Sequence, residues 1–398
     1  METTGASSPQ KPFRLFILGA GFSKPAGLPL ASQLWNEIRI RASHLGGRAN
    51  QLQRDVDNYR EFMRLCCGED ISESEVDFED LMRVLDIEHF LGLRGSDTWS
   101  EDGNESTVIV KTLIGEILAQ RTPEPGDVPE VYLEFARRLC PGDYILTFNY
   151  DVLLERAMDH AGTPYRLFPS RFSSVGDRGA MVDQNRDLEE VVVLKLHGSI
   201  DWFDRKSYSE LVKQAQQHDP TYQPPHPVFG RNAGISLARL LEGPRFDDDP
   251  LQHMFRVRDI RRLYQTNILF HATPWLLSPS ALKILYAHKL RDFWYGLGQA
   301  GLLNFGLAVI GYSLPPQDEY ARQLLYTVIR NYQENWWNGK GVWMKKTPFA
   351  LVDFCQTPSA VDQLKGRYRF VNWDRAILWE DGFNQEALDV IFRQTEWK

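Results

Sequence analysis

The sequence predicts an α/β protein built on a doubly wound, mainly parallel sheet. Two observations lead to this fold class. Short apolar runs of strand length recur along the chain, and segments with apolar residues at helical spacing separate them. Alternating strands and helices are typical of parallel sheets that carry helices on both faces. We therefore expect one such sheet, interrupted by two insertions.

The first expected strand is FRLFIL at residues 13–18, which runs directly into a glycine. A helix is expected over LASQLWNEIRIRA, after Pro29. Strand, glycine turn and helix form the phosphate-binding arrangement of Rossmann-like folds. The other expected strands are short apolar runs, several of them rich in β-branched residues. They cover residues 143–148, 165–168, 191–196, 307–310 and 349–352, and helices are expected at 152–161 and 319–332.

Two stretches break this alternation and are predicted to be insertions. Residues 41–139 space their apolar residues at three and four, which favours a helical insertion packed beside the sheet. Residues 205–265 contain the irregular segments YQPPHP, RNAGIS and FDDDP, which favour an irregular insertion or lid. The expected core comprises residues 13–40, 140–204 and 266–398, and residues 1–12 form a flexible polar tail.

Composition narrows the class of protein. The chain has 398 residues, of which 43% are hydrophobic and 25% charged, as in folded globular proteins. Its formal net charge of -8 argues against a globally basic nucleic-acid-binding protein. The chain has no run of eighteen apolar residues, and its start lacks the apolar core of a signal peptide. We expect a cytoplasmic protein without a membrane span, for which direct binding of nucleic acid is not expected.

Four cysteines occur, at Cys66, Cys67, Cys140 and Cys355. No two of them have the C-x-x-C spacing that structural zinc sites use. We therefore expect reduced thiols, no zinc module and no bound metal.

The segment GAGFS is the first candidate for ligand binding, with Gly19, Ala20, Gly21, Phe22 and Ser23. Backbone amides at the start of a helix bind anions, and glycine lets a pyrophosphate approach the main chain closely. The alternative is a tight turn that only packs a helix against a strand.

Polar residues also follow the later strands, at the edge where ligands of open α/β sheets collect. Asn149, in TFNYD, carries an amide that can hold ribose hydroxyls and position a water molecule. Asp151 either orients such a partner or caps the following helix. His197, in LHGSIDW, is the best candidate for a general base, because histidine as a residue type has an unperturbed pKa of about 6.5.

Two further strand ends carry candidate residues. Gly311 and Ser313, in GYSL, follow the strand at 307–310, and Asp353 follows the strand at 349–352. An adenine-ribose ligand would reach these positions in an open α/β sheet. Asp318 either begins the next helix or contacts the same ligand.

Taken in order, GAGFS, TFNYD, LHGSIDW and GYSL resemble the NAD-binding and catalytic segments of the sirtuin superfamily. They are more similar to its bacterial sirtuin-like (Sir2-like) branch. Gly27, Leu28 and Pro29 resemble the sirtuin G-[IL]-P segment, but Leu30, Ala31 and Ser32 stand where deacylating sirtuins have D-F-R. This departure, together with the missing four-cysteine zinc module, argues against protein deacylation. The resemblance covers roughly residues 13–40, 140–204 and 275–355.

The resemblance implies an NAD glycohydrolase with NAD+ as its substrate and nicotinamide and ADP-ribose as products. It implies catalytic roles for Asn149, His197 and Asp151. The residues implied to bind NAD+ share positions in the matching segments: Gly19, Ala20, Gly21, Phe22, Ser23, Pro29, Gly311, Ser313 and Asp353.

Proteins of this branch deplete cellular NAD+ in antiphage defence. An unregulated enzyme of this kind would kill its host, so we expect a homo-oligomer controlled by a separate partner such as a HerA-type ATPase. The alternative is a non-catalytic module that senses NAD or ADP-ribose and controls a partner protein. The paired Asn149 and His197 favour the enzyme, because a sensor does not require them.

Two clusters leave alternatives open. Trp336, Trp337 and Trp343 are either an oligomer contact or part of the core. The run of arginines around Arg256 and Arg261 is either a partner surface or a solvated helix face.

Overall fold

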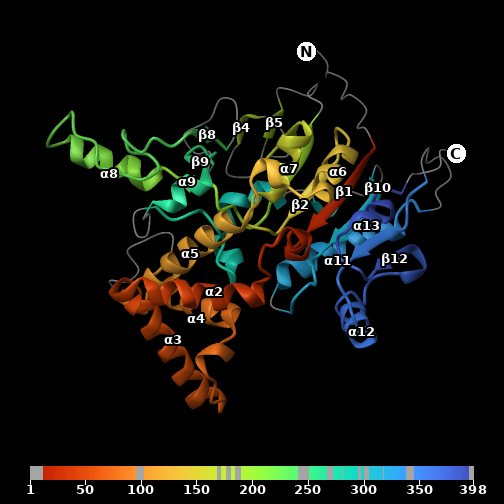
Figure 1. Ribbon diagram of the computed structural model, residues 1–398, viewed down its shortest axis with the longest axis horizontal. Coiled ribbons are helices and arrows are strands. Elements are labelled where there is room, and N and C mark those ends of the chain that lie inside the picture. Colours follow the sequence, from red (N-terminus) through yellow and green to blue (C-terminus); the bar gives the residue numbers. More distant parts are fainter. Residues whose placement is uncertain are drawn as a thin grey trace, which may run out of the picture.

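A seven-stranded sheet forms the centre of the protein in the computed structural model (Figure 1). The structure describes residues 12–95, 103–167, 172–175, 181–183, 190–240, 251–266, 272–280, 282–294, 297–299, 304–316, 318–337 and 345–393. The strand order is β12-β11-β10-β1-β2-β6-β3, and every neighbouring pair is parallel. This confirms the predicted doubly wound α/β fold.

The strands of this sheet are short, and all six that the sequence predicts are present, with ends that move by at most three residues. They are β1 (Phe13–Leu18), β2 (Tyr144–Thr147), β3 (Tyr165–Arg166), β6 (Val191–Lys195), β10 (Asn304–Ile310), β11 (Phe349–Val352) and β12 (Ala376–Trp379). The edge strand β12 was not predicted. Its four residues, AILW, are all only partly buried, as at the edge of a sheet.

The helices connect and cover these strands. They are α1 (Ala20–Ser23), α2 (Ala31–His44), α3 (Asn50–Phe62), α4 (Phe78–Phe90), α5 (Glu105–Arg121), α6 (Glu130–Arg138), α7 (Leu153–Ala161), α8 (Lys206–Gln216), α9 (Ile260–Gln265), α10 (Arg291–Trp294), α11 (Glu319–Glu334), α12 (Pro358–Arg367) and α13 (Gln385–Ile391). Two small antiparallel sheets are added, one of β4 (Phe172–Val175) and β5 (Met181–Asp183), the other of β7 (Trp202–Asp204), β9 (Met254–Val257) and β8 (Leu237–Arg239).

The register of the central sheet aligns the carboxyl ends of its strands. Leu18 at the end of β1 is opposite Thr147 of β2 and Ile310 of β10. Thr147 is in turn opposite Lys195, and Ile310 is opposite Val352. The strand order reverses between β1 and β10, which is where open α/β sheets bind their ligands. The residues that follow these strand ends therefore lie along one edge.

Aromatic side chains hold one face of the sheet to its helices. The Phe16 ring of β1 lies 5.6 Å from Phe135 of α6 and 5.3 Å from Phe392, which follows α13. Phe22 adds a contact of 4.6 Å with Phe383, just before α13. The first and last parts of the chain are thus packed together beside β1, the strand that leads into the glycine turn.

Helix α5 is the centre of the helical part of the molecule. Almost all of its residues are buried, as expected for a helix that is apolar all round. It packs against α2, α3, α4 and α9. On α9, the Tyr264 hydroxyl reaches over α5 to donate to the carbonyl of Ile200 at 2.8 Å. The helices of residues 50–121 are thereby tied to the segment that follows β6.

Two arginines of the cluster form ion pairs, whereas Arg258 and Arg262 are exposed. Arg256 Nε of β9 lies 3.0 Å from Asp201 Oδ2, and Arg261 Nη1 lies 2.8 Å from Glu124 Oε1. Trp337 packs against Tyr332 with a centroid distance of 6.0 Å, and Trp336 is half exposed. Trp343, the residues 1–11 of the expected tail and the segment FDDDP lie outside the described residues.

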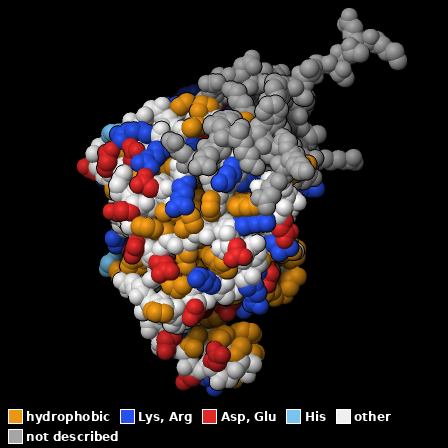
Figure 2. All heavy atoms as spheres, turned by 90° about the vertical axis from the view of Figure 1, so that its right-hand side faces the viewer, with side chains coloured by type: hydrophobic (Ala, Val, Ile, Leu, Met, Phe, Trp, Pro, Cys, Tyr) orange, Lys and Arg blue, Asp and Glu red, His pale blue; other side chains and the backbone are white. Residues whose placement is uncertain are grey.

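The surface carries charges of both signs. On the face drawn in Figure 2, Lys and Arg side chains alternate with Asp and Glu side chains. Within the described ranges, no helix combines the length and the apolar character that crossing a lipid bilayer requires.

Candidate functional site

The glycine turn after β1 and the turn after β10 are packed back to back. Gly19 and Gly21 donate their amides to the carbonyls of Ile310 and Gly311, at 3.0 and 2.8 Å. Gly311 has a φ of +63°, and a Cβ there would lie 2.1 Å from the amide nitrogen of Phe22. The glycines are therefore required by the contact between the two turns, whatever ligand they meet.

This packing leaves few amides of GAGFS for a ligand. The amides of Gly19 and Gly21 are used as described, and that of Phe22 donates to the carbonyl of Gly19 at 2.9 Å. The amide of Ala20 has no acceptor among the described residues. The expected anion site is thus reduced to one free donor at the start of α1, beside the two turns.

Asn149, Ser23 and Asp151 form one hydrogen-bonded network across the strand ends. The side-chain amide of Asn149 donates to the Gly19 carbonyl at 3.0 Å and to Ser23 Oγ at 3.2 Å. Ser23 Oγ donates to Asp151 Oδ2 at 2.8 Å. The other carboxylate oxygen of Asp151 accepts from the amide of Leu153, the first residue of α7, at 3.0 Å. The N-cap position of α7 is Val152, and its side chain forms no capping hydrogen bond.

The network leaves one polar atom of Asn149 available. Its side-chain oxygen accepts no hydrogen bond from the described residues, and the residue is only partly buried. Its amide group is fixed by two acceptors, so this oxygen is held in one direction. A fixed acceptor beside a free amide donor is suited to a ligand with hydroxyl and phosphate groups.

A buried ion pair supports the network from below. Lys195 Nζ, at the end of β6, lies 2.8 Å from Glu155 Oε1 of α7, and both side chains are almost fully buried, with 0% and 4% exposed. The same ammonium group donates to the backbone carbonyl of Asp151. Burial raises the pKa of the Glu155 carboxyl, and Lys195 opposes that shift. The turn between β2 and α7 is thus fixed from inside the protein.

His197 lies one strand further along the same edge, in an aromatic environment. Its ring is 5.0 Å from Phe148 and 5.9 Å from Tyr150, and only 4% of the residue is exposed. The next residue, Gly198, has a φ of +82°, and a Cβ there would lie 2.3 Å from the carbonyl oxygen of Trp275. The chain turns sharply at Gly198, which places the His197 side chain at the sheet edge.

The hydroxyl of Tyr320, near the start of α11, contacts Nε2 of His197. Burial raises the pKa of Tyr320 well above its ordinary value, so the phenol keeps its proton at neutral pH. Which partner donates depends on the His197 tautomer. In this arrangement Nε2 is engaged by Tyr320 and has to be released before it can accept a proton from water.

The rings of Phe148 and Tyr312 lie between the hydrogen-bonded network of Asn149 and the side chain of His197. Their rings are stacked at 4.5 Å, and the Tyr312 hydroxyl donates to Asp318 Oδ2 at 2.7 Å. Asp318 flanks the first residue of α11 without capping it through its side chain, so its established contact is with Tyr312. The motif GYSLPPQD therefore folds back on itself beside the strand ends.

The remaining predicted residues lie outside this network. Asp353 follows β11, one strand from Gly311, and burial raises the pKa of its carboxyl. Ser313 is exposed, and its carbonyl accepts from Arg367 at 3.3 Å. Pro29 precedes α2 and has no hydrogen bond to the network. The structure brings Gly19 to Ser23, Asn149, Asp151 and Gly311 into contact, with His197 reached through Phe148.

Three residues of the site were not predicted from the sequence. Lys195 could have been found, because a lysine inside the apolar run VVVLKL requires a buried partner. Tyr320 and Trp294 have no such signal. Their rings lie 5.4 Å apart, and only the folded chain brings Tyr320 to His197 and Trp294 to Phe148.

The described residues contain no group of three or more His, Cys, Asp or Glu side chains arranged to hold a metal ion. The four cysteines are free thiols.

Comparisons with known proteins point to one family. The family model described as a SIR2-like domain matches residues 143–291. A sirtuin structure that addresses the structural basis of sirtuin substrate affinity is 12% identical, with 95% of this chain and 92% of that chain covered and a TM-score of 0.32. The sirtuin Sir2Tm bound to a propionylated peptide is 14% identical, with coverage of 95% and 91% and a TM-score of 0.26.

The fold is assigned from the order and direction of the strands in the central sheet, and not from these two structures. No curated protein matches the chain. The segment matched by the family model contains Asn149, Asp151 and His197. Through this segment the chain is similar to the SIR2-like domain family.

Proposed function

We propose that this protein is an NAD+ glycohydrolase that cleaves NAD+ to nicotinamide and ADP-ribose. The observation that carries the proposal is the network of Asn149, Ser23 and Asp151, which joins the glycine turn of β1 to the strand end of β2. It supplies a fixed acceptor, while His197 supplies a base on the neighbouring strand. The residue set and its place at the sheet edge match what cleavage of a ribosyl bond requires.

Each residue has a role in this proposal. The free amide of Ala20 and the close-packed Gly19, Gly21 and Gly311 form the surface that a pyrophosphate approaches. The side-chain oxygen of Asn149 accepts a hydrogen bond from a ribose hydroxyl and helps to place the attacking water. Asp151 acts through Ser23, which it holds in position. The same ligand is proposed to contact four further residues, Phe22, Pro29, Ser313 and Asp353.

The proposed reaction needs a base but no acid. Nicotinamide leaves from NAD+ as a neutral molecule because the ring nitrogen is already cationic in the substrate. The ribose passes through an oxocarbenium-like transition state, and water attacks the anomeric carbon, as in glycoside hydrolysis. His197 Nε2 takes the proton of that water once Tyr320 has moved away.

The biological part of the proposal rests on the family resemblance. We propose that the protein depletes NAD+ in the cytoplasm during antiphage defence, as a homo-oligomer controlled by a separate partner such as a HerA-type ATPase. The contact between Tyr320 and His197 is compatible with an enzyme that is inactive until a partner or ligand activates it.

The same contact favours a second function. A protein whose proposed base is engaged by Tyr320 would bind NAD+ or ADP-ribose without cleaving it, and would then act as a sensor that changes the state of a partner. The two functions differ in one observable, which is the fate of bound NAD+.

Mass spectrometry of NAD+, nicotinamide and ADP-ribose over time distinguishes them. The full chain is incubated with NAD+, alone and with an extract of phage-infected cells. Release of nicotinamide that is lost in His197→Ala and kept in His218→Ala supports the hydrolase. His218 is an exposed histidine after α8 and serves as the control. Intact NAD+ in every condition, together with measurable binding, would replace the hydrolase by the sensor.

A further inference from the structure

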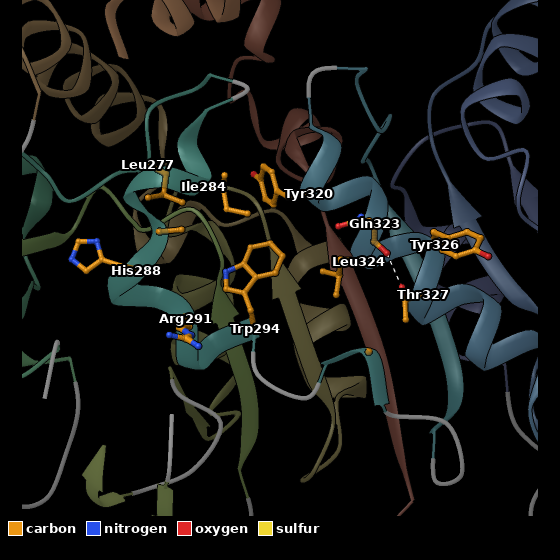
Figure 3. Close-up of a pocket in the computed structure, with 12 residues that line it drawn as sticks. Leu277, Ile284, His288, Arg291, Trp294, Tyr320, Gln323, Leu324, Tyr326 and Thr327 are labelled. Atoms are coloured by element: carbon orange, nitrogen blue, oxygen red, sulfur yellow. Dashed lines mark hydrogen bonds between the residues drawn. The ribbon is translucent and has the colours of Figure 1, made fainter. Parts of the chain in front are cut away.

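A cavity lies beside the proposed site, and Tyr320 is one of the residues that line it. It has a volume of about 710 Å³ and lies between α11 and a wall formed by residues 284–294 together with Gly298 (Figure 3). Pockets that bind small molecules usually measure about 300–1,000 Å³. The cavity therefore has the size of a site for a small organic molecule.

The walls of this cavity are mainly apolar. Leu277, Ile284 and Ala287 line one side and Leu324 the other. Figure 3 shows the Trp294 ring between the two walls, with Tyr320 above it. Aromatic and aliphatic side chains in this arrangement favour a ligand with a flat apolar body.

Two donor groups on α10 lack an acceptor. Trp294 Nε1 is buried without a hydrogen-bond partner among the described residues. Arg291 lines the same cavity, is exposed and forms no ion pair within the described ranges. The spacing of three residues places both side chains on one face of the helix. An indole N–H and a guanidinium only donate. The buried indole N–H lacks an acceptor within the described chain, and the exposed guanidinium is available to pair with an anion.

We propose that this cavity is a regulatory binding site for an organic anion with a flat apolar body, separate from the NAD+ site. The anionic group, a carboxylate, phosphate or sulfonate, pairs with Arg291 and accepts from Trp294 Nε1. The apolar body lies against Leu324, Leu277 and the ring of Tyr320. Binding at the site stands independently of the proposed function, and only its effect on turnover rests on that function.

Tyr320 connects the cavity to the proposed base. Its ring lines the cavity, and its hydroxyl contacts Nε2 of His197. A ligand shifts a side chain only when it binds one of its positions better than another. A flat body that occupies the cavity competes with the present position of Tyr320, and release of the hydroxyl frees His197.

The test uses 8-anilinonaphthalene-1-sulfonate, which joins an aromatic body to a sulfonate and fluoresces when bound in an apolar site. We expect saturable binding to the full chain, weakened about tenfold in Arg291→Gln, as for loss of a charge-assisted hydrogen bond. Arg330→Gln removes the same charge from the exposed side of α11 and is expected to bind as wild type. Equal binding by Arg291→Gln and wild type would overturn the proposal.

A second readout locates the probe. In protein labelled with ¹⁵N-tryptophan, the indole N–H signal of Trp294, assigned by Trp294→Phe, is expected to shift as the probe binds. An unchanged Trp294 signal at saturation would place the probe elsewhere and refute the site.

Turnover separates this proposal from the proposed function. Probe binding that depends on Arg291, in a chain that never cleaves NAD+, upholds the cavity and refutes the hydrolase. NAD+ cleavage without probe binding refutes the cavity alone. Where both occur, we expect the probe to change the cleavage rate in wild type and not in Tyr320→Phe. Competitive displacement of NAD+ by the probe would overturn the separation of the two sites.

Discussion

The two halves of the proposed site are built from different interactions. The polar half, which consists of Gly19, Ser23, Asn149 and Asp151, is closed by hydrogen bonds of 2.8 to 3.2 Å. The aromatic half, which consists of Phe148, His197, Tyr312 and Tyr320, is closed by stacked and tilted rings. The polar half is fixed in position, whereas the aromatic half depends on one contact at His197 that has to break. The difference suggests that ligand binding is preorganised and that the base is controlled.

The largest expected effect tests whether both halves are needed. His197→Ala removes the proposed base, and Asn149→Ala removes the proposed acceptor for the ribose. We expect each variant to lose about 10²- to 10⁴-fold in turnover, the scale for positioned acid and base groups. Initial rates of nicotinamide release measure this. If only one of the two variants loses turnover, the reaction depends on the half of the site that contains the substituted residue, and not on the other half.

The polar half also depends on the buried ion pair beneath it. Lys195→Met leaves the Glu155 carboxylate buried without its partner, so we expect the free energy of unfolding to fall by about 3–5 kcal/mol. The control is the double variant Lys195→Met with Glu155→Leu, which is expected to recover most of that loss. Chemical denaturation measures both. A single variant as stable as wild type would show that the pair does not support the Asp151 turn.

The pH dependence of this variant has a defined sign. Burial raises the pKa of Glu155, so the native carboxyl binds its proton at a higher pH than the unfolded one. Native stability then falls as pH rises from the unfolded pKa through the folded pKa. Removal of Lys195 raises the folded pKa further, so the deficit of Lys195→Met is expected to shrink as pH is lowered toward the unfolded value. A deficit that grows on acidification would contradict this reasoning.

A smaller effect is expected within the polar network itself. Ser23→Ala removes the hydroxyl that joins Asn149 to Asp151, and leaves a buried carboxylate oxygen without its donor. We expect a loss of about 1–3 kcal/mol in unfolding free energy. Ser313→Ala, at an exposed position, is expected to stay within about 0.5 kcal/mol. Thermal and chemical denaturation provide the comparison, and equal losses in both variants would argue against the network.

The smallest expected effect lies in the aromatic half and has the opposite sign. Tyr320→Phe removes the hydroxyl that engages His197 Nε2, so we expect basal turnover to rise by up to about tenfold, the value of one hydrogen bond. Tyr326→Phe, which lines the same cavity from the same helix, is the control. Reduced turnover in Tyr320→Phe would mean that Tyr320 orients His197 rather than restraining it.

The sequence predicts which residues of the polar half meet at the sheet edge, because each of them has a local signal in the sequence. Each predicted candidate in the polar half stands directly after a short apolar run or its glycine turn, and parallel register brings such positions to one edge. Asn149, His197 and Gly311 are found in this way. Lys195 also has a local signal, as a charge inside a buried strand.

Apart from His197, the aromatic half has no comparable signal. Tyr320 and His197 are 123 residues apart, and their contact depends on how α11 packs after β10. The cavity lined by Arg291 and Trp294 depends on the same packing. The glycine turn was interpreted as an anion site, but most of its amides bind other backbone groups, because β10 ends in a second tight turn against it. Long-range contacts of this kind cannot be read from spacing.

The most direct measurement is calorimetric titration of NAD+ into His197→Ala and Asn149→Ala, with nicotinamide release measured on the same samples. We predict that His197→Ala binds NAD+ nearly as wild type without releasing nicotinamide, because the polar half stays intact. Asn149→Ala is predicted to lose both binding and release. Wild-type rates of nicotinamide release in both variants would contradict the proposed function.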